Sequence, residues 1–174
     1  MKEDKNMNII AAASENWGIG KDNALLFHIP EDMKFFRSTT LNKVVVMGRK
    51  TLESFPNQKP LPKRTNIVLS RNPAFSPEGV TVCRTVRELF SEVKKHSTDD
   101  VFICGGEQIY RELIPFCKTA YITKVYSEKE ADSFIPDFDQ MPGWSLEDTS
   151  GVLEDNGYKF SFNLYKNNNV VPID

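Results

Sequence analysis

The chain has 174 residues and a mass of 19.9 kDa, which is enough to bury the core of one domain. Its 22 basic and 24 acidic residues leave a formal net charge of −2, which excludes a general attraction to nucleic acid or anionic membranes. The apolar runs are far shorter than a membrane span and the N-terminus lacks a signal peptide, so we expect a cytoplasmic protein.

Short β-branched runs alternate with helical patterns, which is typical of an α/β domain on a mostly parallel sheet. The first predicted strand is 7–13, and a helix over 30–39 follows, with a proline at its start. Further strands are predicted at 43–47, 65–70, 79–83, 101–104 and 120–126, and further helices at 51–55, 86–96 and 107–114. Thr85 and Glu88 form a capping box for the third helix. The late alternating runs 144–148 and 158–165 predict an antiparallel pair at the sheet edge.

Within the first predicted helix, Asp32 lies on the apolar side. At about 100° per residue, Ile29, Met33 and Phe36 share one arc, and Asp32 falls beside it. A carboxylate turned toward a core needs a partner, so a cationic or hydrogen-bonding ligand would suit it. An acid in a first helical turn is also stabilised by the helix dipole without any function, as Glu31 illustrates. The helix alone leaves both interpretations of Asp32 open.

Two predicted strand ends carry basic residues, and ligands bind at the carboxyl edge of parallel sheets. Arg49 and Lys50 follow Gly48 at a helix start, which is typical of an anion site, although a solvated basic turn has the same composition. The segment is not a Walker loop, because the first glycine of that motif is missing. Ser70 and Arg71 end another strand, and this second cluster favours a phosphate monoester.

Gly105 and Gly106 lie between a predicted strand and the helix at 107–114. Paired glycines permit the close approach of a flat ligand, although a tight connection uses them as well. The two histidines have no metal-ligand spacing, the three cysteines are dispersed, and no nucleophile elbow is present. We therefore expect no metal, reduced cysteines and a reaction in which a bound cofactor supplies the reactive group.

Several segments, taken in order and spacing, closely resemble the dihydrofolate reductase family over residues 7–165. They are IIAAASENWGIGKDNALLFHIPEDM, TLNKVVVMGRKTLESF, NIVLSR, VFICGGEQIY and AYITKV, followed by Asp132 and IPDF. The resemblance implies a single α/β domain over 1–174, with an eight-stranded, mostly parallel twisted sheet, a C-terminal antiparallel strand and four flanking helices. It also implies an adenosine-binding lobe at about 43–98.

By this resemblance Asp32 is the catalytic carboxylate that pairs with the pterin, and Thr123 hydrogen-bonds behind it. The pterin and benzoyl pocket would be lined by Ile10, Ala11, Met33, Phe36, Phe55, Leu61, Cys104 and Tyr110, and Arg64 would hold the glutamate carboxylate of folate. The cofactor would contact Ala12, Ile19, Gly20, Gly48, Arg49, Lys50, Thr51, Leu69, Ser70, Arg71, Arg84, Gly105, Gly106, Glu107, Gln108 and Ile109. Within that set, Arg49, Ser70, Arg71 and Arg84 match the 2′-phosphate cluster, which implies NADPH.

The implied activity is NADPH-dependent reduction of 7,8-dihydrofolate to tetrahydrofolate, with antifolate inhibitors as further ligands and the monomer as the expected state. The family joins the paired glycines by a cis peptide bond, and its mobile loop matches residues 15–26.

Two departures from the family pattern stand out. Leu26 and Phe27 replace the usual Pro-Trp pair. Cys104 replaces a common Ile or Val, and its simpler interpretation is that of a small apolar substitute without a thiol role.

Two alternative functions share parts of this pattern. A pyrimidine reductase of riboflavin synthesis has the same fold and NADPH, but its substrate phosphate would need a polar site where Phe36, Phe55 and Leu61 stand here. A non-catalytic nucleotide-binding module would keep Arg49 and Arg71 without needing an acid at position 32.

Overall fold

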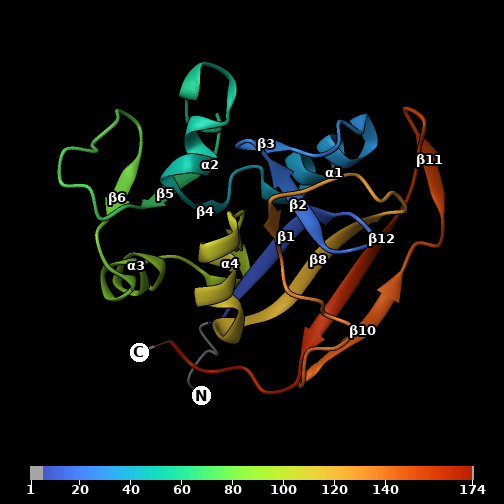
Figure 1. The fold of residues 1–174 in the computed structure, drawn as a ribbon. Coiled ribbons are helices and arrows are strands. Elements are labelled where there is room, and N and C mark those ends of the chain that lie inside the picture. The colour runs from blue at the N-terminus through green and yellow to red at the C-terminus, as the bar shows by residue number, and fades with distance from the viewer. Residues whose placement is uncertain (1–5, 174) are drawn as a thin grey trace.

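One large twisted sheet runs through residues 6–173, the part of the chain described by the computed structural model (Figure 1). Its strands are β1 (Met7–Ala13), β4 (Val44–Gly48), β5 (Thr65–Leu69), β6 (Thr81–Cys83), β7 (Val101–Ile103), β8 (Cys117–Val125), β10 (Trp144–Thr149), β11 (Leu153–Asp155) and β12 (Tyr158–Asn167). Their order is β10-β12-β8-β1-β7-β4-β5-β6, with β11 added beside β12. Neighbours from β8 to β6 are parallel, whereas β12 is antiparallel to β8 and β10. The predicted mostly parallel sheet with an antiparallel C-terminal strand is confirmed.

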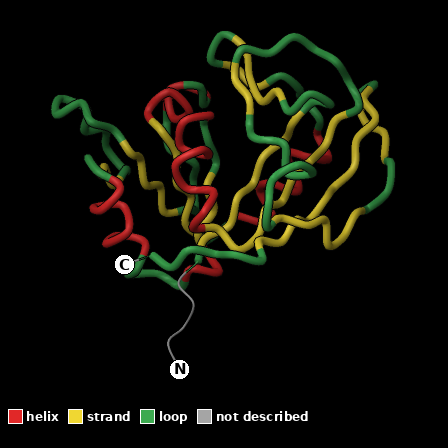
Figure 2. The backbone as a smooth tube through the Cα atoms, turned by 60° about the horizontal axis from the view of Figure 1, so that its bottom comes forward, coloured by secondary structure: helices red, strands yellow, loops and turns green. Residues whose placement is uncertain are grey.

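The helices are α1 (Pro30–Thr40), α2 (Arg49–Glu53), α3 (Val86–Val93) and α4 (Glu107–Leu113), and they cover both faces of the sheet (Figure 2). The fully buried run of β4 shows why both faces are covered. Val44 and Val46 pack in the cluster that includes α3 and α4, while Val45 and Met47 pack with Leu52 of α2. Continuous apolar strands of this kind are typical of parallel sheets with helices on both sides.

The predicted helix boundaries hold with local corrections. Helix α2 begins at Arg49 and not at Thr51, because Gly48 already has extended backbone and serves as its N-cap. Helix α3 ends at Val93, short of the predicted 96, because the last buried residue of its apolar stripe is Val93. The predicted cap of α3 is present, with the Thr85 hydroxyl accepting from the Glu88 N–H at 3.1 Å.

The predicted strand ends also shift. Strand β6 begins at Thr81 and not at Gly79, whose φ of +79° does not suit a strand. Strand β8 is longer than predicted, since it begins at Cys117, which pairs with Met7 of β1. Within the described residues, no helix is long and apolar enough to cross a membrane.

A second, three-stranded sheet was not predicted from the sequence. It contains β2 (Gly18–Lys21), β3 (Ala24–Leu25) and β9 (Ser133–Phe134), in the order β3-β2-β9. Asp132 fixes this pairing, because its N–H donates to the Gly20 carbonyl at 2.9 Å and its carboxylate accepts from the Asp22 N–H at 2.9 Å. The segment that matches the family's mobile loop is thus held by residues more than 100 positions away.

Asn66 anchors the proline-rich loop before β5, and we predict that its removal destabilises the fold. Its buried side-chain amide accepts from the Leu61 N–H at 3.0 Å and donates to the carbonyls of Leu61 at 2.9 Å and Arg64 at 3.1 Å. Asn66→Ala leaves these groups unpaired, so the free energy of unfolding in urea should fall by about 2–4 kcal/mol. Thr65→Ala, at an exposed neighbouring position, should cost about 0.5 kcal/mol. Equal losses in the two variants would contradict this role.

Candidate active site

Helix α1 and strand β8 bring Asp32 and Thr123 together. Pro30 starts the helix and therefore places Asp32 in its first turn. The Thr123 hydroxyl, which is buried, donates to Oδ1 of Asp32 at 2.6 Å. Burial raises the pKa of the Asp32 carboxyl above its usual value of 3.8, and the Thr123 hydrogen bond opposes that shift. The acid predicted to face the apolar side of the helix is therefore half-buried and held by one partner.

Asp32 opens into a cavity of about 410 Å³, which is within the usual size range of ligand sites. The cavity is lined by Ala12, Ile19, Leu25, Leu26, Phe27, His28, Asp32, Met33, Lys129, Asn156 and Tyr158. Four of these, Ala12, Ile19, Asp32 and Met33, are site residues predicted from the sequence. Met33 is 53% exposed, so its apolar side chain faces this open space instead of the core.

Three lining residues had no signal in the sequence. Lys129 lies in the loop after β8, and its Nζ donates to the Leu26 carbonyl at 2.7 Å. Asn156 lies in the turn between β11 and β12, and Tyr158 is the first residue of β12. All three reach the cavity through contacts across the fold, which local sequence patterns do not encode.

The strand ends of β4 and β7 meet at the paired glycines, whose peptide bond is cis as the resemblance implies. The Gly48 N–H donates to the Gly105 carbonyl at 2.9 Å. A Cβ on Gly105, where φ is +115°, would lie 3.2 Å from the Tyr110 ring, and one on Gly48 would lie 3.2 Å from Ile109. Crowding and backbone conformation thus require glycine at position 105, which leaves bare backbone at this edge.

Several residues predicted for the pterin and benzoyl pocket do not line the 410 Å³ cavity, namely Phe36, Phe55, Leu61 and Cys104. Phe55, Leu61 and Cys104 are partly buried and pack on the cluster beneath α2. Arg64 lies opposite, with its guanidinium carbon 5.9 Å from the Phe36 ring centroid and its Nε donating to the Thr40 hydroxyl at 3.1 Å. Burial, with a smaller contribution from nearby Arg37, lowers the pKa of Arg64. The excess positive charge between α1 and the loop before β5 suits a carboxylate.

Tyr110 connects the two halves of the site. This buried tyrosine donates from its hydroxyl to the Ile10 carbonyl at 2.8 Å, which joins α4 to β1. Ala11, next along β1, is half-buried and pairs with Ile122 of β8. The predicted pterin-side residues of β1 are therefore adjacent to the strand that carries Thr123.

The predicted 2′-phosphate cluster is only partly assembled in this structure. Arg84 donates to the backbone carbonyls of Ser70, Asn72 and Phe75, so its guanidinium shapes the loop after β5. Arg49 forms an ion pair with Glu53 at 3.2 Å. Arg71 is exposed and makes no ion pair or side-chain hydrogen bond within residues 6–173.

The other residues predicted to contact the cofactor lie in β2, at the end of β5 and in the helices that follow β4 and β7. Gly20 belongs to β2, Leu69 ends β5, Lys50 and Thr51 lie in α2, and Gln108 and Ile109 lie in α4. Glu107, also in α4, accepts from the Phe134 N–H at 2.9 Å and so connects the glycine pair to the small sheet. Among the described residues, no group of three or more His, Cys, Asp or Glu side chains could hold a metal ion.

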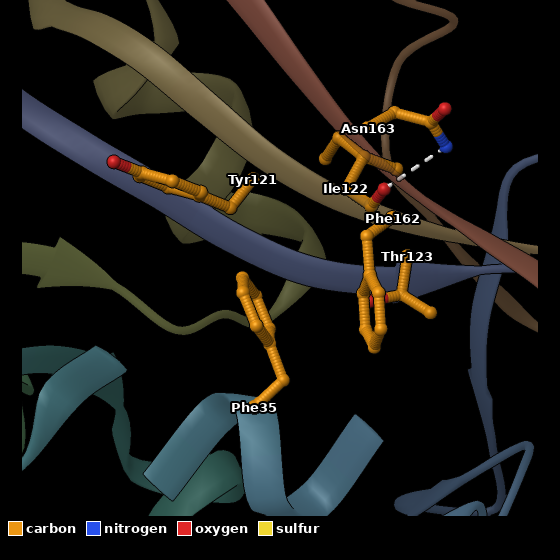
Figure 3. A pocket seen from close by; sticks show the side chains of 6 residues that line it. All are labelled: Phe35, Tyr121, Ile122, Thr123, Phe162 and Asn163. Atoms are coloured by element: carbon orange, nitrogen blue, oxygen red, sulfur yellow. Dashed lines mark hydrogen bonds between the residues drawn. The ribbon is translucent and has the colours of Figure 1, made fainter. Parts of the chain in front are cut away.

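A smaller cavity of about 120 Å³ lies behind Thr123, between α1 and strands β8 and β12 (Figure 3). Aromatic rings dominate its lining, and Phe35 and Phe162 pack with ring centroids 4.7 Å apart. The side-chain amide of Asn163 donates to the Ile122 carbonyl at 3.2 Å, so this polar group is already partnered. The lining carries no carboxylate, and Asp32 remains the acid of the larger cavity.

A family model described as dihydrofolate reductase matches residues 6–167. The chain belongs to the dihydrofolate reductase family. It is 34% identical to the dihydrofolate reductase of Bacillus subtilis (strain 168), over 94% of this chain and 95% of that protein. It is 37% identical to the bifunctional dihydrofolate reductase-thymidylate synthase of Daucus carota, matching 90% of this chain but 33% of that longer protein.

A solved structure of the family agrees over nearly the whole chain. It is the dihydrofolate reductase from Enterococcus faecalis complexed with NADP(H) and RAB-propyl, with a TM-score of 0.85 and 35% identity. The match covers 95% of this chain and 98% of that chain, so the family assignment rests on both sequence and fold.

Removing the Asp32 charge should stabilise the fold more strongly as the pH rises. Because burial raises the pKa of Asp32, this carboxyl keeps its proton in the native state over a range of pH above 3.8, where the same carboxyl in the unfolded chain has already lost its proton. The native state is therefore progressively disfavoured as the pH rises through that range. The free energy of unfolding can be measured in urea for Asp32→Asn and for the wild type between about pH 4 and pH 7. The variant's value minus the wild-type value should increase with pH. A difference that does not change with pH would contradict the pKa shift.

Proposed function

We propose that the chain catalyses the NADPH-dependent reduction of 7,8-dihydrofolate to 5,6,7,8-tetrahydrofolate. The observation that carries this proposal is a half-buried carboxylate facing a 410 Å³ cavity in a member of the dihydrofolate reductase family. Thr123 occupies Oδ1 of Asp32 and leaves Oδ2 for a ligand. The amino-pyrimidine edge of a pterin offers the N–H donors that such a carboxylate needs.

The pterin would lie over Met33 in the large cavity, and the rest of the substrate would extend toward Phe36. The apolar surface beneath α2, with Phe55 and Leu61, would contact the benzoyl ring, and Arg64 would bind the glutamate carboxylate. A ribitol phosphate would gain little from this apolar surface, which disfavours the pyrimidine reductase alternative. A non-catalytic module would not require the pairing of Asp32 with Thr123, and it is disfavoured for that reason.

The cofactor site fits the strand ends. Bare backbone at Gly48 and Gly105 leaves room that a Cβ would fill, and Ala12 and Ile19 line the cavity beside Asp32. We assign the phosphates to the starts of α2 and α4 and the 2′-phosphate to Arg71 with Ser70, within an adenosine-binding lobe at about 43–98. When bound, NADPH supplies the hydride that reduces the imine carbon of the pterin.

The protein's own residues orient the substrate and manage its proton. Asp32 holds the pterin edge and favours its protonated form, while the proton reaches the imine nitrogen beside the reduced carbon through water. The segment that includes β2, held by Asp132, limits access of bulk solvent. Each turnover then adds one hydride and one proton to the C=N bond and leaves NADP⁺.

Asp32→Asn tests the proposed function, because it keeps the shape of the side chain and removes its charge. If Asp32 holds and helps to protonate the pterin, hydride transfer at neutral pH should fall by about 10²-fold or more. The loss should shrink at low pH, where more substrate is already protonated. Single-turnover kinetics from about pH 5 to pH 8 measure both effects. Wild-type rates over this range in a folded variant would refute the mechanism.

Arg71→Ala should change the choice of cofactor. Arg71 is the exposed arginine beside Ser70, and a charge-assisted bond to phosphate contributes roughly 1.5–3 kcal/mol. We therefore expect KM for NADPH to rise by about tenfold or more, with little change in KM for NADH. The control is Arg87→Ala, which removes an exposed arginine from α3 and should leave both constants unchanged. Equal effects on the two cofactors would show that Arg71 does not bind the 2′-phosphate.

A further inference from the structure

Helix α1 has no cap of its own at the end that carries Asp32. Its N-cap is Ile29, which has no side-chain acceptor, and Pro30 has no backbone N–H. The first backbone donor of the helix is therefore the N–H of Glu31. It donates to Oδ2 of Asp155 at 2.9 Å, a residue 124 positions along the chain. The cap that the local sequence lacks comes from another part of the fold.

Asp155 ends β11 and lies at the tip of a tight hairpin with β12. Asn156 and Gly157 have φ values of +51° and +81°, as expected for the two central residues of a type I′ turn. Asp155 pairs with Tyr158 across this turn. The turn brings three side chains of the tip, defined here as residues 155–158, to one side of the site.

Each of these side chains contacts a different point of the segment that leads into α1. Besides the bond from Asp155, the side-chain amide of Asn156 donates to the His28 carbonyl at 2.7 Å. The Tyr158 ring packs edge to face on Phe27, with ring centroids 5.2 Å apart. The tip thus holds residues 27–31, directly before the catalytic carboxylate, at three successive points.

We propose that the hairpin tip is a positioning element for Asp32, with Asp155 as the helix cap supplied from a distance. An aspartate suits this role because its oxygen accepts the orphan N–H and its charge interacts favourably with the positive end of the helix dipole. Asn156 and Tyr158 also line the cavity, so the tip forms part of the wall that faces the substrate. The kinetic consequence rests on the proposed function, whereas the capping itself does not.

Amide hydrogen exchange at Glu31 tests the cap without any reference to activity. In Asp155→Ala, exchange of this amide should be faster by about tenfold, as expected from loss of a helix cap. Asp155→Asn keeps an acceptor oxygen and should recover most of the protection. Glu154→Ala is the matched control, because Glu154 is exposed on the same strand and its side chain makes no hydrogen bond or ion pair within residues 6–173. Unchanged exchange in Asp155→Ala would overturn the cap.

Steady-state kinetics test the positioning role. Asp155→Ala should raise KM for dihydrofolate by about three- to tenfold, the scale of one lost cap, and leave KM for NADPH within about twofold. A purely structural role would lower the active fraction and leave both KM values unchanged. Asn156→Ala, which removes the bond to His28, should act in the same direction as Asp155→Ala. If exchange at Glu31 is faster but KM for dihydrofolate stays at the wild-type value in both variants, the positioning role is overturned. If the wild-type chain has no reductase activity, the proposed function is refuted. The exchange experiment decides the cap in either case.

Discussion

The hydrogen bond between Thr123 and Asp32 is the interaction on which the rest of the site depends. It requires helix α1 to begin at Pro30, because this start turns Asp32 toward the sheet. It also requires the register of β8, which places Thr123 beside Ala12 of β1 and turns its side chain toward α1. A half-buried carboxylate in this position lowers the stability of the protein without a ligand. The same carboxylate favours binding of a ligand that is rich in hydrogen-bond donors, so Asp32 lowers stability and raises affinity.

The surroundings of Asp32 come from segments that are distant in the sequence. Strand β12 lies antiparallel to β8, and its hairpin with β11 reaches back to cap α1 through Asp155. Lys129 holds the loop at Leu26 from the other side. Glu107 connects the start of α4 to β9, which pairs with the segment over the cavity. Several separate polar contacts therefore join the segments around Asp32, in addition to the apolar core that β1, β8 and α4 share.

The candidate site was predicted unevenly, and particular side chains show why. Gly105 could be singled out because a strand, two glycines and a helix form a local pattern, and crowding against Tyr110 explains the requirement. Arg84 looked equivalent to Arg71 in the sequence, yet its guanidinium is bonded to three carbonyls of the loop that follows β5, whereas Arg71 is exposed. Residue type and spacing indicate a phosphate cluster, but they do not show which cations are already bonded within the fold.

The sequence by itself determined the alternation of strands and helices, the mostly parallel sheet and the acid on the apolar side of α1, because apolar periodicity and strand-end residues are local signals. Tertiary structure alone decided the three-stranded sheet around β2, the contribution of Lys129 and the cap from Asp155. The pairing of β2 with β9, the bond from Lys129 and the cap from Asp155 each join groups more than 100 residues apart. Such pairings leave no periodicity in the chain, and only the folded arrangement of β8, β12 and α1 brings the groups within hydrogen-bonding distance.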